Sequence, residues 1–251
     1  MSVVSFLWRN IKWRFHNAFT IVITILQPML WLVLYSAVAG QSMKATGVPN
    51  YTAFILPGLV VLVSFGCCSS SGIMNYLMKT DGSFYRVLIA PVQRSSIIIG
   101  QLLEAVLCTF LEVGIMFVVS IFFSVKIASG FIGILLIIVL VFLCAFFMAG
   151  LAYAISLTLP NEVVYETVMN AIVLPIFFLS TALFPADTLT GALKVAVNLN
   201  PFTHIINALR SLILQGSIEV STLLPVVLLL IIMCGISFYW AYCRLRKETN
   251  L

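Results

Sequence analysis

Six long runs of apolar residues restrict the fold of this chain more than any other feature of its sequence. They fall at Phe19–Gly40, Thr52–Met78, Ile97–Val125, Gly130–Leu159, Val163–Phe184 and Leu223–Cys243. A helix needs about 20 apolar residues to cross a bilayer, so each run is long enough for one crossing. Only 8% of the 251 residues are charged, whereas soluble domains have about 25%, so lipid must cover much of the surface. The sequence therefore predicts an all-α integral membrane protein with six transmembrane helices, in a single domain over residues 1–251.

Basic residues divide unequally between the two sides of such a six-helix plan. One side carries Arg9, Lys12, Arg14, Lys79, Arg86, Arg94, Arg244, Arg246 and Lys247. The other side carries Lys44, Lys126, Lys194 and Arg210. Because cytoplasmic loops are enriched in lysine and arginine, we expect both termini and residues 80–94 in the cytoplasm. The net charge of +5 lies beside the apolar runs, which favours anionic lipid headgroups, and not nucleic acid, as its partner.

Residues 3–16 have the pattern of an amphipathic helix that lies in the cytoplasmic membrane interface. Its apolar face consists of Val4, Leu7, Trp8, Ile11 and Phe15, and its polar face of Ser5, Arg9, Lys12 and His16. The helix is either a plain membrane anchor or a contact for a cytoplasmic partner through Arg9 and Lys12.

Acidic residues in and beside the apolar runs need an explanation, because charge in lipid is expensive. One face of the third run carries Gln101, Glu104, Cys108 and Glu112. Glu104 and Glu112 either line a translocation pathway or have structural roles, at headgroup depth for Glu104 and in a helix–helix hydrogen bond for Glu112. Glu162 and Glu166, after Pro160-Asn161, either stabilise the first turn of the fifth transmembrane helix or contact a cytoplasmic partner.

The segment 185–219 is too long for a tight turn and too apolar for a solvated loop. Pro185, Gly191 and the pair Asn200-Pro201 interrupt it. We expect two short re-entrant helices that dip into the outer leaflet, where protein or trapped water must satisfy irregular backbone. A hairpin on the outer surface is the alternative.

Several enzyme signatures are missing from the sequence. It contains no GxxxxGK[ST] loop that could cradle the phosphates of ATP, and no GxSxG nucleophile motif. The two histidines, His16 and His204, fall on opposite sides of the membrane in this topology, and no cysteine cluster offers a metal site in their place. We therefore expect no enzymatic activity and no cofactor in this chain.

Three motifs, in order along the chain, resemble those of the type-2 permeases of ABC transporters, the class that exports drugs and polysaccharides. The stretch DGSFYRVLIAPVQR resembles the first at Asp81, Gly82, Ser83, Leu88, Ala90, Pro91, Val92 and Arg94. FFLSTALFP resembles the second and ends at Phe184 and Pro185, and NPFTHIINALR resembles the third at Asn200, Pro201, Thr203 and Arg210. Thr181 and Thr190 depart from a glycine and a proline that are common in the family. The resemblance covers essentially the whole chain.

The resemblance implies that residues 80–94 are a coupling element for a separate ATPase. Phe84, Val87 and Leu88 would form the apolar side of a short helix that Pro91 ends, with Arg86 and Arg94 beside it. Asp81 and Gly82 would begin the element. In the outer segment, Phe184, Pro185, Asn200, Pro201 and Arg210 would form an outer gate.

The resemblance also implies the partners of the chain. Two permeases, identical or paralogous, would each dock one ABC ATP-binding subunit, which binds ATP and Mg. We expect an exporter of a hydrophobic or amphipathic, drug- or antibiotic-like compound in the plasma membrane, specifically a bacterial inner membrane. Export of a polysaccharide or lipid-linked glycan is the first alternative. A membrane-embedded lipid-modifying enzyme and an ion-coupled carrier are further alternatives.

Overall fold

A computed structural model describes the chain over residues 7–9, 11–12, 18–42, 51–89, 93–125, 127–183, 190–216 and 219–248. In these ranges the regular elements are helices, and there is no strand. Four of the described helices are long and apolar enough to cross a membrane: α3 (Tyr51–Thr80), α5 (Arg94–Phe122), α6 (Gly130–Ser156) and α10 (Val220–Glu248). The predictions of an all-helical fold and of several membrane crossings are therefore confirmed.

The first and fifth predicted crossings correspond to α2 (Ala18–Ser42) and α7 (Glu162–Phe178). Helix α7 ends at Phe178 because the Ser180 hydroxyl donates to the Phe177 carbonyl at 2.5 Å and accepts from the Ala182 amide at 3.2 Å. Such local side-chain bonds compete with the helical hydrogen bonds. With 17 residues, α7 covers about 26 Å at 1.5 Å per residue, slightly less than the hydrocarbon core. The six-crossing topology stays a prediction.

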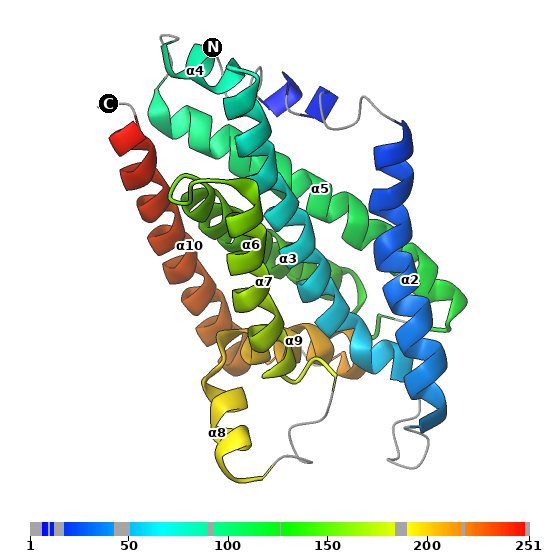
Figure 1. Cartoon of the computed structure of the whole chain (residues 1–251). Helices are drawn as coiled ribbons and strands as arrows, with labels where there is room; N and C mark the ends of the chain where they lie inside the picture. The colour runs from blue at the N-terminus through cyan, green and yellow to red at the C-terminus, as the bar shows by residue number, and fades with distance from the viewer. Residues whose placement is uncertain are drawn as a thin grey trace.

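Helix α3 is the centre of the bundle and packs against α2, α5, α6 and α7 (Figure 1). Small residues bring it close to its neighbours. A Cβ at Gly72 would overlap the phenol of Tyr165 on α7, whose hydroxyl donates to the Ser69 carbonyl at 2.9 Å. Helices α6 and α10 approach in the same way, since a Cβ at Gly150 would lie 2.6 Å from the Ser237 hydroxyl oxygen. Close packing of this kind drives helix association in lipid, where burial of apolar surface gives little advantage.

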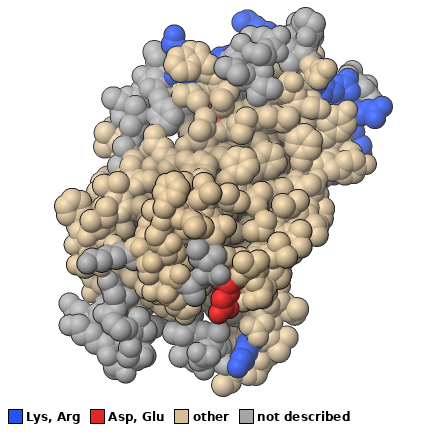
Figure 2. All heavy atoms as spheres, turned by 180° about the vertical axis from the view of Figure 1, so that it is seen from behind, with Lys and Arg blue, Asp and Glu red and all other residues tan. Residues whose placement is uncertain are grey.

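The connections between the long helices lie at two opposite ends of the bundle (Figure 1). Helix α4 (Ser83–Ile89) shares one end with the last turn of α10, while α8 (Gly191–Leu199), α9 (Pro201–Arg210) and a π-helical turn at Ser211–Gln215 share the other. Lysines and arginines gather at the α4 end (Figure 2). The enrichment of basic residues at this end is the basis of the prediction that the α4 end faces the cytoplasm.

Candidate functional site

A sharp turn at Asp81-Gly82 joins the central helix α3 to α4. The Gly82 amide donates to the Lys79 carbonyl at 3.1 Å, and Gly82 has a φ of +68°, in the left-handed region that favours glycine. Asp81 is exposed at this turn. The turn reverses the chain, so α4 lies against the end of the helix that precedes it.

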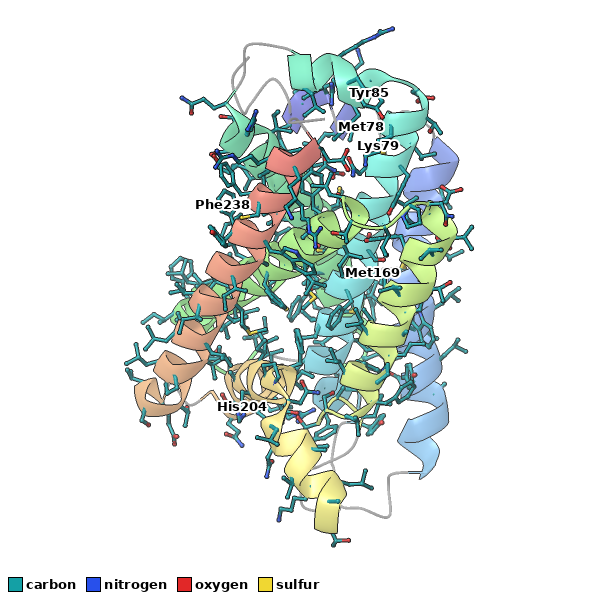
Figure 3. All side chains as sticks on the ribbon, turned by 60° about the vertical axis from the view of Figure 1, so that its left-hand side comes forward. Met78, Lys79, Tyr85, Met169, His204 and Phe238 are labelled. Atoms are coloured by element: carbon teal, nitrogen blue, oxygen red, sulfur yellow. The ribbon has the colours of Figure 1, made fainter. Side chains whose placement is uncertain are left out.

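The apolar face of α4 is buried within the chain itself, and its predicted contact with a separate ATPase stays a prediction. Phe84 is 3% exposed and Val87 is 8% exposed, and the Lys79 ammonium lies 5.3 Å from the centre of the Phe84 ring. An amphipathic helix beside its own membrane domain buries its apolar side there. The outward side of α4 presents Tyr85, which is 57% exposed (Figure 3). Arg86 beside it is also exposed.

The remaining members of the predicted coupling segment are half-buried or lie outside the described residues. Leu88 is half-buried, and Arg94, also half-buried, begins α5. Pro91 lies outside the described residues. The segment 83–89 is therefore a short helix with one anchored side and one presented side.

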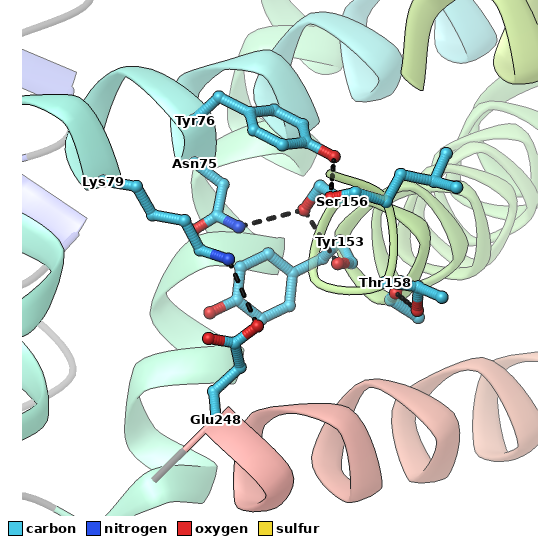
Figure 4. Close-up of polar contacts among 9 residues, drawn as sticks. Asn75, Tyr76, Lys79, Tyr153, Ser156, Thr158 and Glu248 are labelled. Atoms are coloured by element: carbon cyan, nitrogen blue, oxygen red, sulfur yellow. Dashed lines mark hydrogen bonds and ion pairs between the residues drawn. The ribbon is translucent and has the colours of Figure 1, made fainter. Parts of the chain in front are cut away.

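Three side-chain bonds join the end of α3 beside α4 to α10, to α6 and to the turn after α6 (Figure 4). Lys79 forms an ion pair with Glu248 of α10 at 3.3 Å. Asn75 donates to the Ser156 hydroxyl at 3.1 Å, and the Tyr76 hydroxyl donates to the Leu159 carbonyl at 3.0 Å. These bonds join the α4 end of α3 to residues far away in the sequence. No pattern in the sequence points to Glu248, because Lys79 and Glu248 lie far apart in the chain.

Four residues were predicted to contact a cytoplasmic partner: Arg9, Lys12, Glu162 and Glu166. Arg9, in a helical piece at 7–9, donates to the Met78 sulfur at 3.6 Å, and Lys12 is exposed. Of the predicted interfacial helix at 3–16, only residues 7–9 and 11–12 are described, and the rest lies outside the described residues. Glu162 and Glu166 are exposed at the start of α7, where the side chain of Asn161 caps the helix by accepting from the Val164 amide at 2.9 Å.

Asn200 joins three helices at the opposite end of the bundle. Its side-chain oxygen accepts from the Phe202 amide at 3.0 Å and caps α9, which begins with Pro201. Its amide group donates to the carbonyls of Ile176 and Leu179 at the end of α7, both at 2.7 Å. The Asn200 side chain therefore stabilises the turn between α8 and α9 and holds this turn against α7.

Arg210 fastens the last turn of α9 to α3 and to the turn after α7. Its guanidinium donates to the Phe54 carbonyl at 3.2 Å and to the Thr181 carbonyl at 2.6 Å. It also stacks on the Phe54 ring, 3.8 Å from the ring centre, and donates to the Asn207 side chain at 3.1 Å. Burial lowers the pKa of Arg210 to about 10, so it stays protonated at neutral pH. Phe184 and Pro185, the other predicted gate residues, lie outside the described residues.

Helix α9 is packed into the bundle, unlike the surface hairpin that was the alternative prediction. Its side chains Phe202, Ile205 and Ile206 are buried. The Phe202 ring lies 4.9 Å from that of Phe65 on α3. Helix α9 is thus part of the core beside α3.

The two glutamates of α5 have different surroundings. Glu104 is 1% exposed and links α5 to α3, since it accepts from the Ser71 hydroxyl at 2.7 Å. The Cys108 thiol donates to its other oxygen at 3.5 Å, and Gln101 donates to the same Ser71 hydroxyl at 3.3 Å. Glu112 lies two turns farther along α5 and borders a cavity between α2, α3, α5 and α7.

The sequence also matches a known protein family and several named relatives. The model of a family described as ABC-2 type transporter matches residues 1–214. The transport permease ycf38 of Cyanophora paradoxa is 27% identical over 201 residues, which cover 79% of this chain and 69% of the relative. Its namesake in Porphyra purpurea is 29% identical over 76% of this chain and 66% of the relative. ABC transporter G family member 20 of Dictyostelium discoideum is 28% identical over 68% of this chain and 23% of the relative. The chain thus spans about two thirds of the length of the ycf38 relatives.

Proposed function

The chain belongs to the ABC-2 type transporter family and is a multi-pass membrane permease, and on this premise we propose that it forms the membrane unit of an ATP-driven exporter. Two permeases, identical or paralogous, assemble with two ABC ATP-binding subunits, which bind ATP and Mg. The exported compound is hydrophobic or amphipathic and drug- or antibiotic-like. Both termini and α4 face the cytoplasm of a bacterial inner membrane.

The presented side of α4 is the observation that carries this proposal. Tyr85 and Arg86 point outward from a helix whose apolar side is fixed on α3. A short helix held in this way moves as a rigid body, so a partner that displaces it also displaces the bundle. The ion pair of Lys79 with Glu248 carries the displacement to α10.

Charge at this surface favours an acidic groove on the ATP-binding subunit. Arg86 is exposed, and Arg94 begins the next helix on the same side of the membrane. Charge complementarity of this kind raises association rates and selects the correct partner. Arg86→Glu should therefore weaken recruitment of the ATP-binding subunit, and more strongly at low salt.

Purification of the tagged chain from its native membranes tests the proposal. We expect recovery of a subunit with a phosphate-binding loop and ATP hydrolysis, at one copy per permease, and reduced recovery with Arg86→Glu. Glu219→Gln at the other end of the bundle is the control. Transport that follows an ion gradient and survives ATP depletion would refute the proposal in favour of a carrier, and lipid turnover by the purified chain alone would indicate an enzyme.

A further inference from the structure

The last two turns of α10 carry basic side chains at the end of a helix that is long and apolar enough to cross the membrane. Arg244 is half-buried and Lys247 is exposed, and Figure 2 shows lysines and arginines gathered at this end of the molecule. No charged residue lies between Glu219, just before α10, and Arg244. Arg244 is therefore the first charge that the helix places beyond its apolar segment.

The length of α10 places these side chains at the depth of lipid headgroups. At 1.5 Å per residue, Trp240 lies about 30 Å from Val220 at the start of the helix, which is the thickness of the hydrocarbon core. Tryptophan prefers this boundary, where its ring meets lipid and its N–H group meets water. Arg244 and Lys247 lie about 6 and 10 Å farther along the axis, so their long side chains reach the phosphate layer.

Trp240, Arg244 and Lys247 share one face of α10, because residues three or four positions apart are neighbours on a helix. The same face continues into the apolar segment with Ile236, which is 63% exposed, and Ile232, which is 60% exposed. From the basic end inward, the face thus offers two cationic groups, an indole ring and apolar surface. A phospholipid carries its phosphate, its ester groups and its acyl chains in the same order.

Acidic side chains do not neutralise this end of the bundle, where basic residues outnumber acidic ones in the six-helix plan. Glu248, in the last turn of α10, pairs with Lys79 of α3 at 3.3 Å. Residues 249–251, which follow the described part of α10, have no ionisable side chain. The one acidic residue outside the described ranges is Asp187. It follows α7 and precedes α8, which end and begin at the opposite end of the bundle (Figure 1).

An anionic lipid suits this face better than a second copy of the chain or a soluble subunit does. Two copies that met through this face about a twofold axis would bring Arg244 and Lys247 close to their own counterparts, and like charges repel. A soluble subunit could contact the basic end of the face but would leave Ile232 and Ile236 in lipid. A phospholipid contacts both parts of the face at once.

We propose that the outward face of α10 binds an anionic phospholipid. Arg244 and Lys247 hold its phosphate, Trp240 lies beside its ester groups, and Ile236 and Ile232 contact an acyl chain. Such a site differs from the general attraction of basic loops to a membrane, because two side chains account for the preference at one place. The site does not depend on the proposed exporter, since it concerns the lipid contacts of the chain itself.

Quenching of Trp240 fluorescence by brominated lipids measures the lipid composition at this face. The other three of the four tryptophans are replaced by phenylalanine. The protein is reconstituted in mixtures of dioleoyl phosphatidylglycerol and phosphatidylcholine, one of which has brominated chains. We expect a higher association constant at Trp240 for phosphatidylglycerol. Arg244→Gln and Lys247→Gln should each lower this preference about fivefold, and high salt should lower it as well.

The double variant of Lys12→Gln and Arg86→Gln is the matched control for the double variant of Arg244→Gln and Lys247→Gln. It makes the same change in net charge at the same end of the bundle. Lys12 and Arg86 are exposed and lie on other elements, so the preference at Trp240 should stay nearly unchanged. Equal association of the two lipids without any charge substitution would overturn the site. An equal loss of preference in the control would also overturn it, because the charge of the whole surface would then be the cause.

Thermal unfolding in detergent gives a second readout that needs no substitution of tryptophan. Added phosphatidylglycerol should raise the unfolding temperature of the unmodified chain more than phosphatidylcholine does, because a ligand that binds the folded state stabilises it. The double variant of Arg244→Gln and Lys247→Gln should lose this difference. If that variant kept the difference but no longer recruited an ATP-binding subunit, the face would be a protein contact, and the lipid site would be refuted.

Discussion

Replacing Phe84 by alanine should release α4 from the membrane domain without altering the surface that a partner would meet. The ring is 3% exposed, lies under the Lys79 ammonium at 5.3 Å and packs edge-to-face with Tyr85 at 5.8 Å. Truncation of a buried phenylalanine to alanine costs about 3–5 kcal/mol. Because α4 lies at the end of the bundle, where the structure can relax, we take about 3 kcal/mol, from the low end of that range. At 1.4 kcal/mol per factor of ten, the population of the detached state should rise about a hundredfold.

Hydrogen exchange of the α4 amides measures this population directly, because these amides exchange when the segment opens locally. The chain is studied in nanodiscs without an ATP-binding subunit. We expect peptides from residues 83–89 of Phe84→Ala to exchange about a hundredfold faster, while peptides from the middle of α3 keep their protection. Tyr85→Ala is the control, since Tyr85 is 57% exposed and its loss should leave exchange of the same peptides nearly unchanged.

One result would refute the reasoning. If Phe84→Ala exchanged at the original rate but no longer recruited the ATP-binding subunit, the ring would be a partner contact and not an anchor. The apolar side of α4, with Phe84 and Val87, would then face the ATP-binding subunit. Loss of recruitment together with fast exchange would agree with the anchored α4 described above.

Three further predictions concern contacts that hold the bundle together. Arg210→Ala should lower the thermal unfolding temperature in detergent and reduce transport, because two carbonyls lose a charged donor, at about 1.5–3 kcal/mol for such hydrogen bonds; unchanged stability and transport would exclude the gating role. A double-mutant cycle of Lys79→Ala and Glu248→Ala should give a coupling energy of about 0.2–1 kcal/mol that decreases with salt, since both side chains are partly exposed. Gly72→Ala should destabilise the fold by about 1–3 kcal/mol through overlap with the phenol of α7, whereas Gly114→Ala, with open space around it, should not; equal melting temperatures would contradict this packing.

The apolar runs predicted the long helices closely, for a reason specific to membranes. The run Thr52–Met78 became α3 at Tyr51–Thr80, and Gly130–Leu159 became α6 at Gly130–Ser156. Backbone groups within lipid must be satisfied internally, so a long apolar run has few structures other than a helix. The helix in the run Val163–Phe184 was predicted less well. Its end at Phe178 depends on the local hydrogen bonds of the Ser180 hydroxyl and not on hydropathy.

The orientation of α4 could not be predicted in the same way. Its sequence shows that Phe84 and Val87 share an apolar side, yet that side can be covered by a partner or by the chain itself, and the pattern is identical in both cases. In the single chain that side packs on α3, and only the folded positions of α3 and α4 reveal this contact. The ion pair of Lys79 with Glu248 could not be predicted from the sequence either, because it joins two helix ends that meet only in the folded bundle.

Glu104 and Glu112 show most clearly where inference from a membrane sequence stops. The two residues lie eight positions apart on one face of α5, so their spacing predicts a single polar stripe. The structure divides that stripe: Glu104 meets the Ser71 hydroxyl of α3, whereas Glu112 meets a cavity because α2 and α7 leave space there. In a soluble protein, the contrast between buried and exposed positions would help to separate such residues. In lipid, both the core and the outer surface are apolar, so only the positions of neighbouring helices determine which carboxylate bonds across a helix contact and which one borders a cavity.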